Sequence, residues 1–144
     1  MALFRQEDEA RVRELLAELE RPVELLLVLG PETEPLPGAR DIDFSAEARR
    51  VCEELAGLSE HLSVQVTDDT NTLPVDRFPA IAVLPEGRDV GIRYYGLPWG
   101  YELWSLVGAC LDAGRREPPL TEESREALAR LDHDLAVDVF VTPT

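Results

Sequence analysis

The stretch Arg77-Phe78-Pro79-Ala80-Ile81 places a proline at the first turn of an apolar strand over residues 79–84. Proline in a sheet is confined to strand starts and edges, since it cannot donate to the ladder. A cis bond before proline is a feature of tight turns. We therefore predict a cis Phe78–Pro79 bond that turns the chain into a buried strand. Residues 86–89, Glu-Gly-Arg-Asp, are typical of a hairpin turn, after which residues 91–96 pair back.

Helical and strand patterns alternate on the N-terminal side of this hairpin. Residues 6–20 have helical spacing, and residues 23–29 form an apolar run typical of a buried strand in a parallel pair. A second helix is expected to follow, with Asp43 or Ser45 as its N-cap. Residues 62–66 then alternate as a strand.

A third helix is expected after residue 100, and Gly114 ends it. The first two strands are predicted to pair in parallel and the last two as an antiparallel hairpin. The sequence thus predicts an α/β fold, a mixed four-stranded sheet with helices on both faces. The predicted core residues of the three helices are Val12, Leu15, Leu16 and Leu19, then Ala48, Val51, Cys52, Leu55 and Leu58, then Leu103, Leu106, Val107, Cys110 and Leu111.

The composition is strongly acidic, with a net charge of −15, a pI near 4.4 and no lysine. Nucleic-acid binding relies on clustered Lys and Arg, so no nucleic-acid partner is expected, and anionic membrane surfaces are disfavoured. The lack of lysine excludes Schiff-base and P-loop chemistry from these residues. No stretch approaches the roughly 20 apolar residues that span a bilayer, and the acidic N-terminus is unlike a signal peptide. We expect a soluble, cytoplasmic protein.

Residues 117–144 differ in character from the rest. After a proline-containing linker, Thr121 is expected to cap a fourth helix whose first turn is acidic. Residues 135–141 are apolar apart from Asp138 and are predicted to form a strand. A strand without a covalent neighbour exposes an edge that invites pairing. We therefore expect a homodimer, with residues 117–144 packed across the two-fold axis or exchanged between chains.

Several stretches together are similar to a known family. They are Pro22-Val23-Glu24-Leu25, Leu73-Pro74-Val75 ahead of Phe78-Pro79-Ala80, residues 93–102 and residues 134–144. Their order and spacing resemble the double-thioredoxin-fold proteins. These include the glutaredoxin-like protein disulfide oxidoreductases of thermophiles and the N-terminal domain of the flavoprotein subunit of bacterial alkyl hydroperoxide reductase. The resemblance implies a thioredoxin-like domain over residues 1–116, and a helix and strand at 117–144 that open a second such unit. It also implies electron transfer from a flavoprotein to a peroxidase, within cell redox homeostasis.

The dithiol of that family is absent from these residues, which contain no Cys-x-x-Cys. The resemblance places Ile42 and Ser45 where a dithiol member has its first pair of cysteines, and a second pair just after residue 144. A helix N-terminus lowers the pKa of a cysteine thiol, and Ile42 has no thiol. Ser45 keeps its hydroxyl near neutral pH and is expected to cap the helix. The first unit of alkyl hydroperoxide reductase also lacks this dithiol, so the resemblance to it is the closer one.

The two cysteines, Cys52 and Cys110, fall on apolar helix faces and are expected to be buried and structural. A disulfide between them would require side chains that face each other across the sheet, so none is expected. Cys52 is the candidate redox thiol if the chain has one. His61, placed at the end of the second helix, and His133 lack metal-ligand spacing, so neither a metal nor a cofactor is expected.

Phe78, Pro79 and Ala80 are the candidate groove, because thioredoxin folds pair this backbone with extended peptides. The aromatic residues at 94–104 form either core or a partner surface. Two functions stay open. One is a non-catalytic thioredoxin-fold module that serves as a scaffold, docking or dimerisation unit in a thiol–disulfide or peroxide-reducing system. The other is a fragment or monothiol form of a disulfide oxidoreductase. The residues present favour the first, with a peroxidase or flavoprotein reductase as partner.

Overall fold

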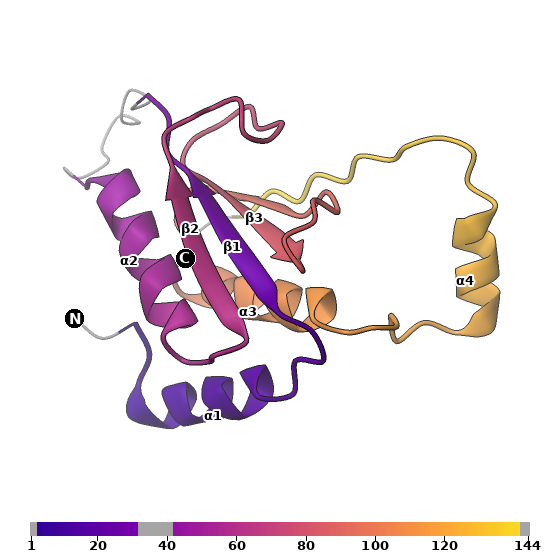
Figure 1. Cartoon of the computed structure of the whole chain (residues 1–144), viewed down its shortest axis with the longest axis horizontal. Coiled ribbons are helices and arrows are strands. Elements are labelled where there is room, and N and C mark those ends of the chain that lie inside the picture. Colours follow the sequence, from indigo (N-terminus) through magenta and orange to yellow (C-terminus); the bar gives the residue numbers. More distant parts are fainter. Residues whose placement is uncertain (1–2, 32–41, 142–144) are drawn as a thin grey trace.

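Four strands form one mixed sheet in the order β2-β1-β3-β4 in the computed structural model, which describes residues 3–31 and 42–141. β1 and β2 are parallel, whereas β3 is antiparallel to both β1 and β4. The predicted mixed sheet is confirmed (Figure 1). The elements are α1 (Gln6–Leu16), β1 (Val23–Val28), α2 (Phe44–Ala56), β2 (Leu62–Thr67), β3 (Ala80–Pro85), β4 (Arg93–Tyr95), α3 (Tyr101–Ala113) and α4 (Glu122–Ala129).

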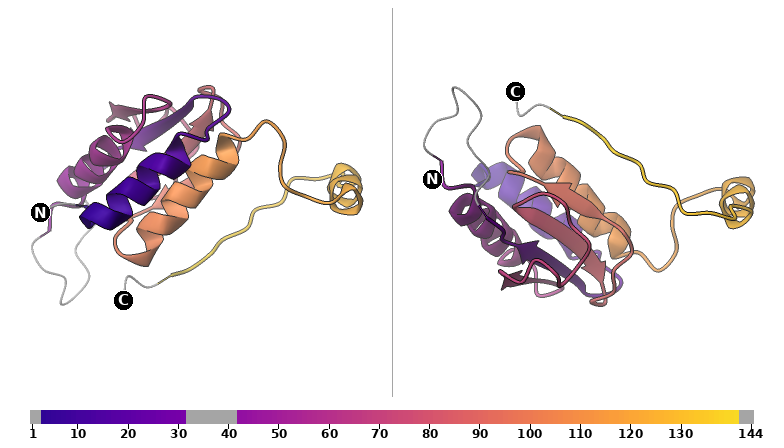
Figure 2. Two further views of the ribbon diagram at one scale, coloured as in Figure 1. Left: turned by 90° about the horizontal axis from the view of Figure 1, so that it is seen from below. Right: turned by 90° about the horizontal axis from the view of Figure 1, so that it is seen from above.

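The helices α1, α2 and α3 cover one face of the sheet, as the two views of Figure 2 show. Their buried side chains share one core with Leu25, Leu27, Ile81 and Val83 of the central strands. The prediction of helices on both faces was therefore wrong. The alternate residues of β1 and β3 form a second, smaller core, which is covered by Leu73, Val75 and Phe78 from the connection between β2 and β3. That connection is irregular, so apolar loop side chains take the place of a helix.

The turn between β3 and β4 forms as the sequence predicts. Arg88 N–H donates to Pro85 C=O at 3.0 Å, and φ is positive at both Glu86 (52°) and Gly87 (72°). Two positive φ angles match the right-handed twist of a hairpin. The strands pair two residues out of the register that a two-residue turn alone would give, since Ala80 faces Tyr95 rather than Arg93.

The C-terminal end of α3 is tied to the turn that precedes β1. Helix α1 ends at Leu16 rather than at residue 20, yet Leu19 remains buried. The Leu19 side chain lies so close to Gly114 that a β-carbon there would overlap it. Glu20 N–H also donates to Gly114 C=O at 3.0 Å, and Arg21 Nε donates to Ala113 C=O at 2.9 Å. This junction fixes α3 against α1, and α2 and α3 then share the covered face of the sheet.

The segment after residue 116 stands away from the sheet (Figures 1 and 2). Thr121 caps α4 as predicted, since its hydroxyl accepts from Ser124 N–H at 3.2 Å. The strand predicted at residues 135–141 does not form, because the alternating apolar pattern finds no strand to pair with. Its large apolar side chains are exposed, namely Leu135, Val137, Val139, Phe140 and Val141. Within the described ranges, no helix has the length and apolarity needed to cross a membrane.

Candidate functional site

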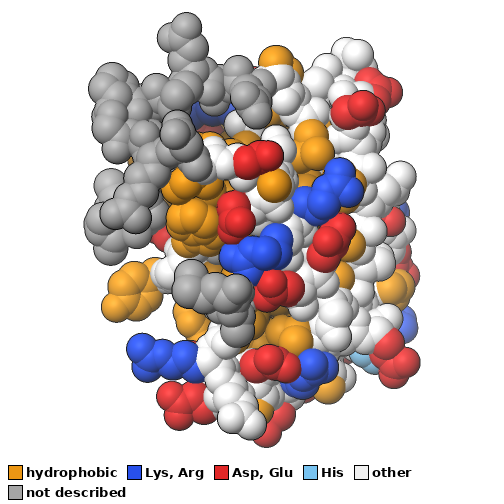
Figure 3. All heavy atoms as spheres, turned by 90° about the vertical axis from the view of Figure 1, so that its left-hand side faces the viewer, with side chains coloured by type: hydrophobic (Ala, Val, Ile, Leu, Met, Phe, Trp, Pro, Cys, Tyr) orange, Lys and Arg blue, Asp and Glu red, His pale blue; other side chains and the backbone are white. Residues whose placement is uncertain are grey.

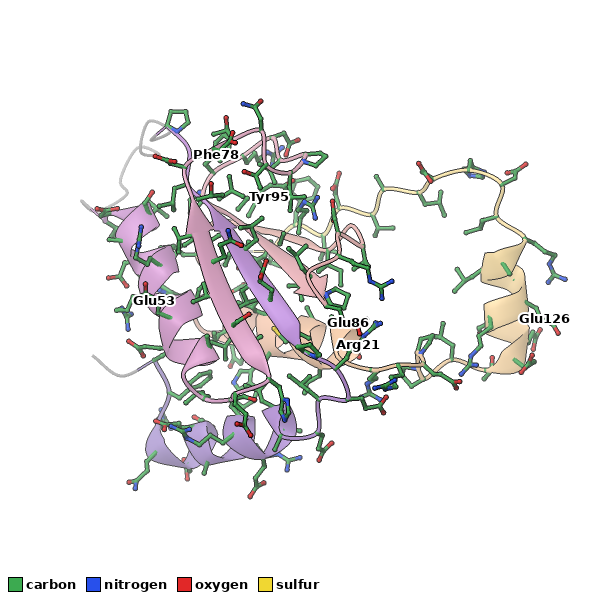
Figure 4. All side chains as sticks on the ribbon, viewed as in Figure 1. Arg21, Glu53, Phe78, Glu86, Tyr95 and Glu126 are labelled. Atoms are coloured by element: carbon green, nitrogen blue, oxygen red, sulfur yellow. The ribbon has the colours of Figure 1, made fainter. Side chains whose placement is uncertain are left out.

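The proline turn at the start of β3 is the best-defined candidate site. The Phe78–Pro79 bond is cis, as predicted. Pro79 is buried, and its carbonyl accepts from Gly96 N–H at 3.0 Å. The Phe78 ring lies against Gly30, just beyond the end of β1, where a β-carbon would overlap the ring. A glycine at this position therefore lets the ring pack on the backbone. Figure 4 shows Phe78 and Tyr95 at the same end of the sheet.

The amide and the carbonyl of Phe78 lie beside this packed ring. Among the described residues, none bonds to its amide or to its carbonyl. The next strand residue, Ala80, is fully buried and sits between Val28 and Tyr95 in the ladder. An unpaired amide and carbonyl at the end of a sheet can pair with an extended peptide. Pro79 and Ala80 are therefore buried, whereas the Phe78 amide and carbonyl have no partner among the described residues. A groove at these residues stays a prediction.

Two side chains of β4, Arg93 and Tyr95, contact the loop that leads into the proline turn. Arg93 donates from Nη1 and Nη2 to the two Asp89 carboxylate oxygens at 2.7 and 2.8 Å, and from Nε to Pro74 C=O at 3.2 Å. The bond from Arg93, followed by one from the Gly91 amide, lowers the pKa of Asp89 to about 2. Burial, followed by a hydrogen bond with Asp76, raises the pKa of Tyr95.

Sequence reasoning missed this anchoring. The four-residue spacing of Asp89 and Arg93 across the hairpin was the only signal for it. The contact to Pro74 is between residues 19 apart and carries no local pattern.

The N-terminus of α2 holds the two positions assigned to a vacated dithiol. Ile42 is half-buried just ahead of the helix, and Ser45 is half-buried in its first turn. Of the two predicted N-caps, the structure uses Asp43, and the expectation that Ser45 caps the helix was wrong. Asp43 is the N-cap, and its Oδ1 accepts from Ala46 N–H at 2.9 Å. Asp43 lies just ahead of the helix and has the extended backbone that an N-cap requires, whereas Ser45 lies inside the first helical turn. The assignment of Ile42 and Ser45 to dithiol positions stays a prediction.

Both cysteines are free and fully buried. Burial raises the pKa of Cys52 to about 12, with a smaller contribution from Glu53. Burial likewise raises the pKa of Cys110 to about 12. The two side chains belong to the same core on one side of the sheet, so the idea that they would have to meet across the sheet was wrong. Because the thiolate is the nucleophile, neither thiol is suited to exchange in this environment.

The remaining titratable and aromatic candidates do not join the proline turn. His61 lies in the turn before β2 rather than at the end of α2, and His133 contacts its neighbour Asp132 at 2.7 Å. The residues that the structure describes hold no group of three metal-ligating side chains. The aromatic residues at 94–104 differ in burial, since Tyr94 is half-buried whereas Tyr101 is 83% exposed. Trp104 packs edge-on against Phe4, with ring centroids 6.1 Å apart.

The comparisons with known proteins agree with this geometry. No family model matches the chain. The alkyl hydroperoxide reductase protein AhpF of Xanthomonas campestris pv. phaseoli is 32% identical over 111 residues, which cover 75% of this chain and 20% of that protein. The chain is similar to AhpF. It spans about a fifth of the length of this curated relative.

Solved structures show the same fold. AhpF of Enterococcus faecalis superposes with a TM-score of 0.74 at 24% identity, over 90% of this chain and 62% of that one. A protein disulfide oxidoreductase from Aeropyrum pernix superposes with a TM-score of 0.70 at 24% identity, over 91% of this chain and 56% of that one. These likenesses show that the sheet and its flanking helices are thioredoxin-like, as predicted.

Proposed function

We propose that the chain is a thioredoxin-fold module of a peroxide-reducing system that binds its redox partner without transferring electrons itself. One observation carries the proposal: both thiols are fully buried in the core. Thiol–disulfide exchange requires an accessible thiolate, and a buried thiol with a pKa near 12 does not supply one. The cytoplasm, where thiols are kept reduced, is the compartment that fits two free cysteines.

The proline turn is the proposed contact with the partner. The Phe78 amide and carbonyl would pair with an extended segment of the partner, because no described residue occupies them. Ile42 and Ser45 would occupy the positions of a dithiol and would contact the partner without reacting with it. The expected partner is a peroxidase or a flavoprotein reductase, as the similarity to AhpF of alkyl hydroperoxide reductase suggests.

Residues 117–144 would connect this domain, over residues 1–116, to a second thioredoxin unit or to another chain. The support is their exposed apolar surface, since Leu120, Leu128 and Leu131 are exposed along with the side chains at 135–141. Such surface is normally covered by a partner. The related AhpF structure is also longer than this chain, which covers 62% of it. A homodimer is part of the proposal.

Nuclear magnetic resonance titration tests the binding role. The isotope-labelled chain is mixed with a purified peroxidase subunit of an alkyl hydroperoxide reductase. The amide signals of Phe78 and Ala80 are expected to shift, whereas that of Val90, near the hairpin at the opposite end of β3, is expected to stay in place. Shifts confined to the hairpin, or none at all, would contradict the proposed contact.

Insulin reduction driven by dithiothreitol tests the alternative, a monothiol or fragment of a disulfide oxidoreductase. The chain is expected to add nothing to the background rate, because neither thiol is accessible. Turnover that is lost in the Cys52→Ser variant would instead establish Cys52 as a redox thiol.

A further inference from the structure

β2 is an uncharged edge strand, and no residue that the structure describes pairs with its outer side. β2 is the outermost strand on its side, and its six residues, LSVQVT, include neither a charged residue nor a proline. Charged residues make up 30% of the whole chain. Proteins usually protect an edge strand with a charge, a proline, a bulge or a covering segment. β2 lacks the first two of these protections.

The pairing with β1 determines which backbone groups of β2 face the open side. Val23 N–H donates to His61 C=O at 2.9 Å, and Leu29 N–H donates to Thr67 C=O at 2.8 Å. Alternate residues of a parallel strand bond to the same neighbour, so the backbone groups of Leu62, Val64 and Val66 point outward. Among the described residues, none bonds to the backbone of Val64 or Val66 on this side.

We propose that β2 pairs antiparallel with β2 of a second copy of this chain, about a two-fold axis through Val64. Val64 then lies opposite Val64, and Leu62 opposite Val66, on the face that the helices cover. Ser63 lies opposite Gln65 on the other face. Within β2 every cross-strand pair joins side chains of like polarity, and the same register places the acidic Glu60 opposite Asp68 just beyond the two ends of the strand. Because Leu62 N–H already donates to Ser59 C=O at 3.3 Å, the amides of Val64 and Val66 supply the hydrogen bonds.

Helix α2 packs on both β1 and β2, and Figure 1 shows it beside β2 at this edge of the sheet. The two copies of α2 therefore face each other across the proposed axis. Arg49 and Glu53 are exposed on α2, and Figure 4 shows Glu53 on its outer side. Figure 3 views this side of the molecule, where acidic and arginine side chains are interspersed with apolar ones. Two chains of net charge −15 can approach here without facing a single-sign surface.

This interface specifies the homodimer proposed above and is independent of any redox role. Sedimentation velocity of the full chain over a range up to about 100 µM tests it, because dimer formation follows mass action. The variant Ser63→Glu with Gln65→Glu places two like-charged pairs across the axis, and its dimer dissociation constant is expected to rise roughly tenfold or more. Both side chains are exposed, so the fold is expected to survive. The matched control is Ser63→Glu with Gln65→Arg, which opposes unlike charges and is expected to keep the dimer.

Three results would overturn the proposal. The unaltered chain could remain monomeric throughout the range. The doubly acidic variant could dimerise as well as its matched control. Alternatively, substitution of Leu135, Val137 and Val139 by Glu could alone abolish the dimer, which would place the interface in the C-terminal segment. A failed peroxidase titration would leave this interface untouched, so the two proposals fail separately.

Discussion

Replacing Asp89 by Asn is expected to loosen the loop that carries the proline turn. The bidentate pair with Arg93 lowers the pKa of Asp89 from 3.8 to about 2, a difference that corresponds to about 2.4 kcal/mol. The Asp89 side chain is 32% exposed, so solvent screening reduces the expected loss of stability to about 1–1.5 kcal/mol at neutral pH. Urea unfolding of both proteins at pH 7 measures this difference.

The stability difference between the two proteins is expected to depend on pH. A carboxyl whose pKa is lowered in the folded state contributes its full stabilisation above its unfolded pKa, near 3.8, and loses it as the pH falls through about 2. The two proteins should therefore differ fully at pH 7 and converge as the pH falls from about 4 to about 2. A difference that stays constant over this range would refute the electrostatic reasoning.

Hydrogen exchange locates the effect. Because Arg93 also donates to Pro74 C=O, the amides of residues 68–79 should exchange faster in the Asp89→Asn variant. The exchange rates of the α2 amides should stay the same. Uniformly faster exchange would show that the pair supports the whole fold rather than the loop.

Three further outcomes are expected on the same structural grounds. Both thiols are expected to resist an aromatic disulfide reagent in the native protein and to react fully in denaturant, because Cys52 and Cys110 are buried; native reaction of either would contradict this. Gly30→Ala is expected to cost about 1–3 kcal/mol by overlap with the Phe78 ring. The control is Gly57→Ala, where φ is −66° and a β-carbon meets only ordinary contacts, and it should be neutral or slightly stabilising. Equal losses of stability at both sites would show that overlap with the Phe78 ring is not the cause. Thr121→Ala should weaken α4 by about 1 kcal/mol. Since α4 buries no residue, the main thermal unfolding midpoint of the protein should not change, and calorimetry that shows a lower midpoint would indicate that α4 packs on the sheet or its helices.

The sequence predicts the sheet well because its signals are local. Pro79 at a strand start, Glu86-Gly87 at a turn and the apolar run from Val23 each determine their own backbone. The side of the sheet that each helix covers is not a local property. Leu73, Val75 and Phe78 cover the second face from an irregular loop, and irregular spacing carries no periodic signal.

Two other errors have the same origin. The alternation over residues 135–141 is a strand pattern, but a strand forms only beside another strand. The Arg93 contact to Pro74 joins β4 to a loop that precedes β3, and only the folded sheet brings them together. Local patterns therefore predict elements, whereas the site is assembled by long-range contacts.

Trapping of a mixed disulfide tests whether the chain transfers electrons to a peroxidase. The reduced chain is incubated with the oxidised peroxidase subunit, quenched with an alkylating reagent and analysed by mass spectrometry of the intact proteins. We expect Cys52 and Cys110 to stay unmodified and the peroxidase to stay oxidised, while the titration reports binding at Phe78. A covalent adduct through Cys52 would show that the chain transfers electrons and would refute the non-catalytic role.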